Sequence, residues 1–131
     1  MAKAALFEPI RVRNSNLSNR IVIAPMCQYS AENGCMTDWH LIHLGHLNLS
    51  EAALLTIEAT AILPEGRITY ADVGLWNDET EAAMGRTLKS IRRWSDMPIG
   101  IQLNHAGRKA YTEVPWKGGA LRRRVPAGSG P

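Results

Sequence analysis

Three short apolar runs mark the chain, and each is separated from the next by a longer amphipathic stretch. Residues 21–24, 53–60 and 99–104 are rich in aliphatic and β-branched side chains. Continuous apolar runs of this length are typical of strands that are buried on both faces of a parallel sheet. Pro25 closes the first run, and a turn-forming segment at residues 64–66 follows the second. The pattern therefore predicts three buried strands.

The two stretches between these runs have helical features. Thr37 or Asp38 can cap a helix that runs to about Leu49. The second helix begins with a capping-box pattern, in which Glu81 follows Asp78 by three residues. Its apolar residues recur on one helical face and are Met84, Leu88, Ile91 and Trp94. Strands and helices are thus expected to alternate.

This alternation predicts an α/β fold built from right-handed parallel βαβ units. Such units form either an open doubly wound sheet or a TIM (β/α)8 barrel. No G-x-G-x-x-G motif follows the first predicted strand, so the dinucleotide-binding sheet loses its usual mark and the barrel is favoured. A barrel typically needs about 250 residues, whereas this chain has 131. We therefore expect the amino-terminal β/α units of a barrel, incomplete as the sequence stands.

Charge is unevenly distributed along the chain, whose net charge is +3. Residues 1–105 carry nine Lys and Arg against eleven Asp and Glu, whereas residues 106–131 carry six against one. From Pro115 onward no apolar period is left, and nothing is expected to pack. We therefore predict a barrel segment at 1–117 and a disordered, basic Gly/Pro-rich tail at 118–131.

The three consecutive arginines of this tail raise the alternative of a nucleic-acid-binding protein, because basic clusters neutralise phosphates. No aromatic residues are interleaved with them, and no binding fold is recognisable. This role ranks third among the functions considered, and no nucleic-acid partner is predicted.

The remaining composition is that of an ordinary soluble domain, with 45% hydrophobic and 21% charged residues. No stretch approaches the roughly 18 apolar residues of a membrane span. No apolar run follows Lys3 as it would in a secretory signal. We therefore expect a cytoplasmic protein with no membrane partner, in which Cys27 and Cys35 remain reduced thiols.

Polar residues gather where each predicted strand ends, and these positions are Cys27, Gln28, Tyr29, Glu58, Thr60, Gln102, Asn104 and His105. Because the carboxyl ends of parallel strands meet at one edge of a sheet, these side chains predict a ligand site at that edge. The alternative is that Gln102 and Thr60 only satisfy buried backbone groups, and the sequence leaves both interpretations open.

Three histidines, His40, His43 and His46, recur at intervals of three residues. Each interval rotates the side chain around a helix by about 60°. The three rings therefore do not converge on one ion, and no metal site is predicted.

Four segments carry a more specific pattern: NRIVIAPMCQY at residues 19–29, EATA at 58–61, PEGRIT at 64–69 and QLNHAGRKA at 102–110. In sequence, order and separation they resemble the Old Yellow Enzyme family, over about residues 6–117. The cysteine after Pro-Met is similar to that of the thermophilic-like subgroup. The resemblance implies a TIM barrel that holds FMN and takes hydride from NADPH or NADH. Hydride would pass via flavin N5 to a small activated alkene.

The resemblance also implies which residues bind the cofactor. The backbone of Ala24, Pro25 and Met26 would lie against the isoalloxazine ring, and Ala59 would offer it backbone polar groups. The Gln102 amide would meet the pyrimidine edge, which needs a group that both donates and accepts hydrogen bonds.

Two residues are implied to act in catalysis. Cys27 would also contact the cofactor, beside the C4 carbonyl and N5, and would tune the reduced ring, because a thiol is a weak donor. Tyr29 would border the substrate pocket. The alternatives are that Cys27 is a small core hydrophobe and that Tyr29 is an ordinary half-buried aromatic residue.

The sequence covers only the first part of the family's pattern. The His or His/Asn pair that holds the substrate carbonyl, the usual proton-donating tyrosine and the loops that grip the FMN phosphate come later in the family and are not found here. We therefore expect a segment of an FMN-dependent oxidoreductase, with a second copy or a complementary barrel fragment as its protein partner. The alternative is a non-catalytic remnant or interaction fragment of the same family.

Overall fold

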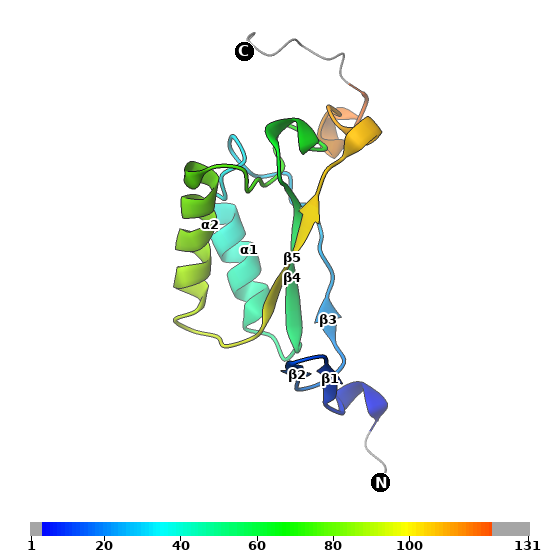
Figure 1. Ribbon diagram of the computed structural model, residues 1–131, viewed down its shortest axis with the longest axis vertical. Helices are drawn as coiled ribbons and strands as arrows, with labels where there is room; N and C mark the ends of the chain where they lie inside the picture. Colours follow the sequence, from blue (N-terminus) through cyan, green and yellow to red (C-terminus); the bar gives the residue numbers. More distant parts are fainter. Residues whose placement is uncertain (1–3, 122–131) are drawn as a thin grey trace.

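A three-stranded parallel sheet organises residues 4–121, the part of the chain that the computed structural model describes (Figure 1). Its strands lie in the order β3 (Val22–Ile23), β4 (Leu54–Ala61) and β5 (Ile99–Asn104). Helix α1 (Asp38–Asn48) connects β3 to β4, and α2 (Asp78–Ile91) connects β4 to β5. Both helices lie on one side of the sheet. The predicted alternation of strands and helices is confirmed.

A short hairpin that was not predicted precedes the sheet. Strands β1 (Ile10–Val12) and β2 (Ser15–Leu17) pair antiparallel, and strands this short leave little alternating signal in the sequence. Figure 1 shows the hairpin near the amino-terminal ends of β3 and β4. It therefore lies opposite the edge where the candidate site was expected. The remaining regular segments are 3₁₀ turns at Ala5–Phe7, Pro64–Gly66, Gly107–Lys109 and Pro115–Lys117.

Helix α1 begins after Thr37, one of the two predicted caps. The Thr37 N–H donates to Nδ1 of His40 at 3.0 Å, so a histidine takes the place of the Glu or Gln of a usual capping box. His40, Leu44 and Asn48 are buried at four-residue spacing and form the face that lies against the sheet. Within residues 4–121, no helix is both long enough and apolar enough to cross a membrane.

Helix α2 starts one residue earlier than predicted. Its N-cap is Asn77, because the Asn77 side-chain oxygen accepts the Thr80 N–H at 2.9 Å. Asp78 is already helical, and Thr80 rather than Glu81 completes the capping box. The prediction that Asp78 and Glu81 form the box was therefore wrong. Asn and Asp are about equally good caps, so the sequence does not distinguish the two neighbours.

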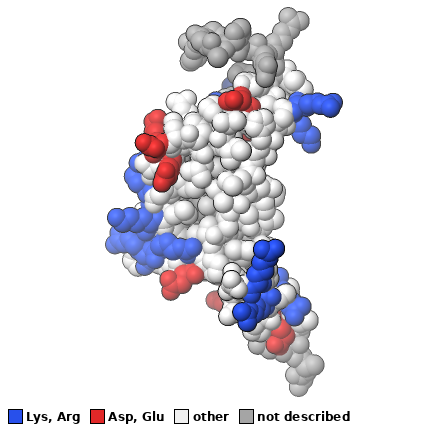
Figure 2. Space-filling view, viewed as in Figure 1, with Lys and Arg blue, Asp and Glu red and all other residues white. Residues whose placement is uncertain are grey.

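The other end of α2 also differs from the prediction. The helix ends at Ile91, so Trp94 lies beyond it and is 75% exposed. Acidic residues occupy the first turn and Lys89 the last, which matches the helix dipole. Figure 2 shows this order as an acidic and a basic patch on the α2 side of the molecule.

The core lies between β4 and the two helices. Its buried members are Ala31, Met36, Leu44, Leu55, Ile57, Val73, Met84, Ile91 and Met97. Leu55 and Ile57 of β4 are only 1% and 2% exposed. Leu88 packs against the cluster, so this residue, Met84 and Ile91 form the predicted apolar face of the second helix without Trp94.

The middle strand alone is buried as predicted. Val22 of β3 is 48% exposed, and Ile101 and Leu103 of β5 are 36% and 60% exposed. Within residues 4–121, β3 and β5 each pair with only one strand, and the helices cover one side of the sheet. The prediction that these two strands are buried on both faces was therefore wrong, because burial requires neighbours as well as apolar side chains.

The predicted start of the tail is not a break in the structure. The Gly119 N–H donates to the Val114 carbonyl at 3.3 Å, and Leu121 forms a β-bridge with Thr112. Residues 118–121 therefore make backbone contacts with residues 112–114, although all four are exposed. The rest of the predicted tail, including its three arginines, lies outside the described residues.

Candidate functional site

The carboxyl ends of β4 and β5 lie together in the upper part of Figure 1, and the chain that follows β3 runs on toward the same edge of the sheet. The turn after β3 supplies residues 24–30, β4 supplies Glu58 and Ala59, and β5 supplies Gln102. The parallel topology therefore brings together residues that lie far apart in the sequence, as predicted.

Cys27 is partly buried at this edge, against β4. The Ala59 backbone hydrogen-bonds to its sulfur. Burial raises the pKa of the Cys27 thiol most, the Asp72 and Glu58 carboxylates raise it further, and the hydrogen bond from Ala59 opposes them. Such a thiol stays protonated at neutral pH and offers its S–H as a weak donor.

Tyr29 lies beside Cys27 and is hydrogen-bonded to it. Burial is the main cause that raises the pKa of the Tyr29 hydroxyl. Its backbone φ is 51°, a left-handed conformation that is uncommon for a residue other than glycine. Its ring packs edge-on against Trp116, with centroids 6.1 Å apart and planes at 78°. Sequence analysis missed Trp116 because it lies in a segment rich in Gly, Pro and Arg that has no apolar period.

Ala59 and Gln102 are register partners in β4 and β5, so they lie side by side on the same face of the sheet. Ala59 is 7% exposed, whereas Gln102 is exposed, and its amide has no hydrogen-bond partner among residues 4–121. Gln102 therefore does not serve to satisfy buried backbone groups. That alternative does hold for Thr60, which is fully buried and donates to the Glu58 carbonyl at 2.9 Å.

The segment that leads to Cys27 is open to the surface. Ala24 is exposed, Pro25 is partly exposed, and Met26 is 67% exposed. The Gln28 side chain donates to the Met26 carbonyl at 2.9 Å, so this segment is held in place without being covered. A planar ligand could lie against its backbone.

Two buried carboxylates lie near the turn: Glu58, which the sequence analysis placed among the polar strand-end residues, and Asp72, which it did not single out. Glu58 hydrogen-bonds to His40 Nε2 at 3.0 Å. Asp72 accepts the Ile68 N–H at 2.6 Å and the Thr69 hydroxyl at 2.8 Å, and burial is the main cause that raises its pKa. The available signal was the acidic Glu58 inside an apolar strand, because a buried carboxylate needs partners.

The three histidines have separate surroundings. His40 bonds to Glu58, His43 stacks on Trp39 with their planes 8° apart, and His46 is exposed. Burial lowers the pKa of His43. Among residues 4–121, no group of three or more His, Cys, Asp or Glu side chains is placed to hold a metal ion.

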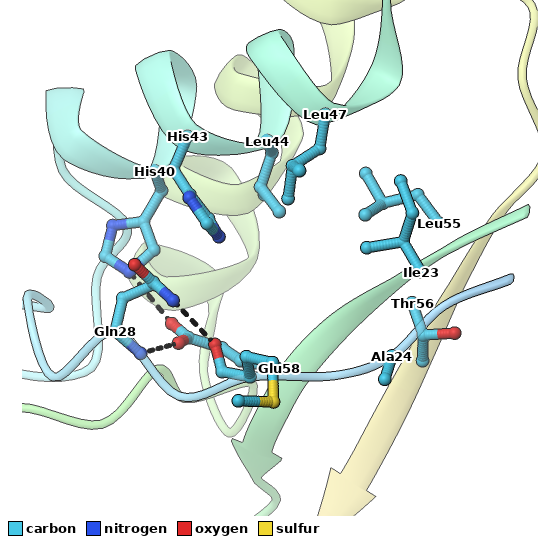
Figure 3. Close-up of a pocket in the computed structure, with 11 residues that line it drawn as sticks. Ile23, Ala24, Gln28, His40, His43, Leu44, Leu47, Leu55, Thr56 and Glu58 are labelled. Carbon is cyan, nitrogen blue, oxygen red and sulfur yellow. Dashed lines mark hydrogen bonds and ion pairs between the residues drawn. The ribbon is translucent and has the colours of Figure 1, made fainter. Parts of the chain in front are cut away.

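A cavity of about 180 Å³ lies between α1 and the sheet (Figure 3). Its apolar walls include Ile23, Leu44 and Leu55, and its polar end is formed by Gln28, His40 and Glu58. Pockets for drug-sized ligands typically measure about 300–1,000 Å³. The cavity is therefore too small for a flavin, and a ligand of that size would need the open edge.

Known proteins match almost the whole described chain. The model of the NADH:flavin oxidoreductase / NADH oxidase family matches residues 5–120. An NADH:flavin oxidoreductase of Gibberella zeae is 46% identical over 111 residues, which are 85% of this chain and 27% of the relative. An NADPH dehydrogenase of Bacillus cytotoxicus is 47% identical over 107 residues, 80% of this chain and 31% of the relative. The chain thus spans less than a third of either relative.

Solved structures give the same result for the fold. Morphinone reductase superposes with a TM-score of 0.73 and 27% identity, over 82% of this chain and 28% of its own. A complex of morphinone reductase with tetrahydroNAD has a TM-score of 0.74 and 27% identity, over 83% of this chain and 29% of its own. An Old Yellow Enzyme from Pichia sp. has a TM-score of 0.74 and 25% identity, over 82% of this chain and 28% of its own. The described strands and helices are therefore β/α units of a TIM barrel, as predicted, and the barrel is not closed within them.

Proposed function

Because this chain belongs to the NADH:flavin oxidoreductase / NADH oxidase family, we propose that it forms the ring-binding part of an FMN-dependent NAD(P)H oxidoreductase that reduces activated alkenes. One observation carries the proposal. Three strand ends bring the Cys27 thiol, the Ala59 backbone and the Gln102 amide together at an open edge of the sheet.

The residues at this edge fit a flavin ring. The exposed Gln102 amide both donates and accepts hydrogen bonds, as the pyrimidine edge requires. Asn104 follows two residues later on the same face, and its Nδ2 is buried without a partner among residues 4–121. An unpaired buried amide costs about 1–3 kcal/mol, so a polar ligand here would stabilise the protein. The open backbone of residues 24–26 offers a surface for the flat ring.

When bound, FMN would supply the redox chemistry, taking hydride from NADPH or NADH and passing it to an activated alkene. The chain's own residues would bind and orient. Cys27 would present a protonated thiol to the ring, since its pKa is raised. Tyr29, braced by Trp116, would border the substrate. The nicotinamide analogue in the morphinone reductase complex supports the choice of hydride donor.

Retention of FMN would need a further part of a barrel. In TIM barrels the phosphate is usually held by the loops after strands 7 and 8. The described residues supply three parallel barrel strands, and their exposed edges at β3 and β5 would accept the neighbouring strands. We therefore propose a complementary barrel segment, or a second copy that supplies one, as the protein partner.

The test is a completed barrel, in which residues 5–120 of this chain replace the matching segment of the Bacillus cytotoxicus NADPH dehydrogenase. We expect a yellow protein with one FMN per chain that reduces 2-cyclohexenone anaerobically with NADPH. The matched control is the same dehydrogenase without the segment, which should do neither. The 131-residue chain alone should lose FMN when free flavin is removed. A folded but colourless completed barrel would support the non-catalytic remnant instead.

A further inference from the structure

The carboxylate of Glu58 joins two separate parts of the chain (Figure 3). One oxygen accepts His40 Nε2–H of α1 at 3.0 Å, and the other accepts the backbone N–H of Gln28 in the turn after β3. The side chains of His40 and Glu58 are 1% and 5% exposed. Each oxygen thus has one donor in surroundings from which water is largely excluded, where such bonds are strong.

The orientation of the His40 ring follows from the start of α1. The Thr37 N–H donates to Nδ1 at 3.0 Å, so Nδ1 must be the unprotonated ring nitrogen. The ring proton therefore lies on Nε2, where it donates to Glu58. The capping interaction that begins the helix also sets the direction of the bond to the carboxylate.

The side chain of Glu58 can face both of its donors, on His40 and Gln28, because β4 has a bulge at Glu58. Ile57 and Ala59 oppose the consecutive residues Ile101 and Gln102, so Glu58 is the unpaired residue of the register shift. The bulge allows Glu58 to turn toward α1, while Ala59 keeps its place beside Gln102. One irregularity thus serves both the buried pair and the open site.

The Gln28 N–H held by Glu58 lies between Cys27 and Tyr29, the two expected catalytic residues. The Gln28 side chain is also fixed at its oxygen, which accepts Trp39 Nε1–H at 3.1 Å. The Thr37 hydroxyl donates to the Ser30 carbonyl at 3.0 Å on the far side of Tyr29. The left-handed backbone of Tyr29, with φ 51°, needs such restraint on both sides to persist.

We propose that His40 and Glu58 are positioning residues, which hold the turn at Gln28 so that Cys27 and Tyr29 face the ligand edge of the sheet. Both side chains are buried, and they hold the turn through the Gln28 backbone. The role assigned to the turn rests on the proposed flavin function. The positions of the turn and of its thiol can be measured without flavin.

Two variants of the 131-residue chain separate this role from simple stabilisation of the core. Glu58→Gln keeps the size of the side chain but leaves one acceptor oxygen for two N–H donors. His40→Gln keeps a residue that suits the capping box and removes the ring donor. Met84→Ala is the control, because Met84 is buried in the core and is not among the hydrogen-bonded residues of the turn. All variants carry Cys35→Ser, so that Cys27 is the sole thiol.

The readouts are hydrogen exchange of the Gln28 amide and the rate at which Cys27 reacts with a disulfide reagent, under conditions where every variant is folded. We expect Glu58→Gln to speed exchange about tenfold or more, since a hydrogen bond to the carboxylate is lost. Loss of that carboxylate also removes one cause of the raised Cys27 pKa, so the thiol rate is compared per thiolate, and it should still rise. His40→Gln should have the same effect to a smaller extent, and it keeps the test decisive if Glu58→Gln does not fold. Rates in both variants no different from those of Met84→Ala would overturn the proposal, whatever the completed barrel does with FMN.

Discussion

Strands β4 and β5 lie side by side with similar apolar sequences, but their surroundings differ. Leu55 and Ile57 of β4 are almost fully buried, whereas Ile101 and Leu103 of β5 are 36% and 60% exposed. β4 has a strand on each side, and β5 has one on a single side within the described residues. The same contrast holds at the site, where Ala59 is buried and its neighbour Gln102 is exposed.

The contrast separates two roles. β4 supplies the interior of the described chain, because it packs against both helices and holds the buried Glu58. β5 supplies contacts that are still open, both for neighbouring barrel strands and for a ligand. We therefore expect substitutions in β4 to change the stability of the chain, and substitutions in β5 to change binding and assembly.

The largest effect should come from the interior of β4. Ile57→Ala should lower the free energy of unfolding by about 2–5 kcal/mol, because it leaves a cavity among well-packed side chains. Leu103→Ala in β5 should change it by no more than about 0.5 kcal/mol, as is usual for exposed positions. Urea unfolding of the two variants measures the difference. Equal losses would contradict the contrast between the strands.

Binding should show the opposite order. In the completed barrel, Gln102→Leu should weaken FMN binding by roughly ten- to hundredfold, because a polar edge of the ring loses its partner. Thr60→Val is the matched control in β4, since the Thr60 hydroxyl bonds only to the backbone of its own strand. Titration with FMN measures both affinities. An unchanged affinity in Gln102→Leu would remove Gln102 from the site.

A smaller effect is expected from substitution of Cys27, which lies in the turn after β3. In the completed barrel, Cys27→Ala should shift the flavin midpoint potential while FMN content stays nearly unchanged, because a thiol offers only a weak hydrogen bond. Cys35→Ala should leave the potential where it is. Spectroelectrochemical titration gives the potentials. Loss of FMN at an unshifted potential would mean that Cys27 retains the flavin instead of tuning it.

The smallest effect concerns pH. The pKa of Cys27 in the folded chain lies above its usual value, which is about 8.5 in unfolded peptides. As pH rises, the unfolded state loses this proton first, so the stabilisation is complete below about pH 8.5 and is lost as pH rises through the folded pKa. Alkylation of Cys27 in a Cys35→Ser chain should therefore have its midpoint above that pH. A midpoint at or below it would show that neither burial nor the two carboxylates raise the pKa of the thiol.

Local signals in the sequence were enough to predict the order of the three sheet strands and the two α-helices, but not the amino-terminal hairpin. Each strand of the parallel sheet has its own apolar run, and α1 has an identifiable cap at Thr37. The start of α2 was misplaced by one residue because Asn77 and Asp78 are both good caps. Burial of β3 and β5 could not be read from their residues, since exposure depends on which neighbours are present.

The part of the candidate site that depends on parallel strand order could be predicted from the sequence. Strand order alone brings Cys27, Ala59 and Gln102 to one edge. The pairing of His40 with Glu58 was not predictable, because it depends on a bulge in β4 and on a backbone N–H as the second donor. Trp116 was missed for a similar reason, since only the folded chain brings it onto Tyr29.

The central claim is that the strand ends of this chain bind the ring of FMN. The most direct test is a crystal structure of the completed barrel with FMN bound. We predict that the Gln102 amide lies within hydrogen-bond distance of the pyrimidine edge and that Cys27 Sγ lies beside the C4 carbonyl and N5. A ring bound elsewhere, with neither side chain in contact with it, would contradict the claim.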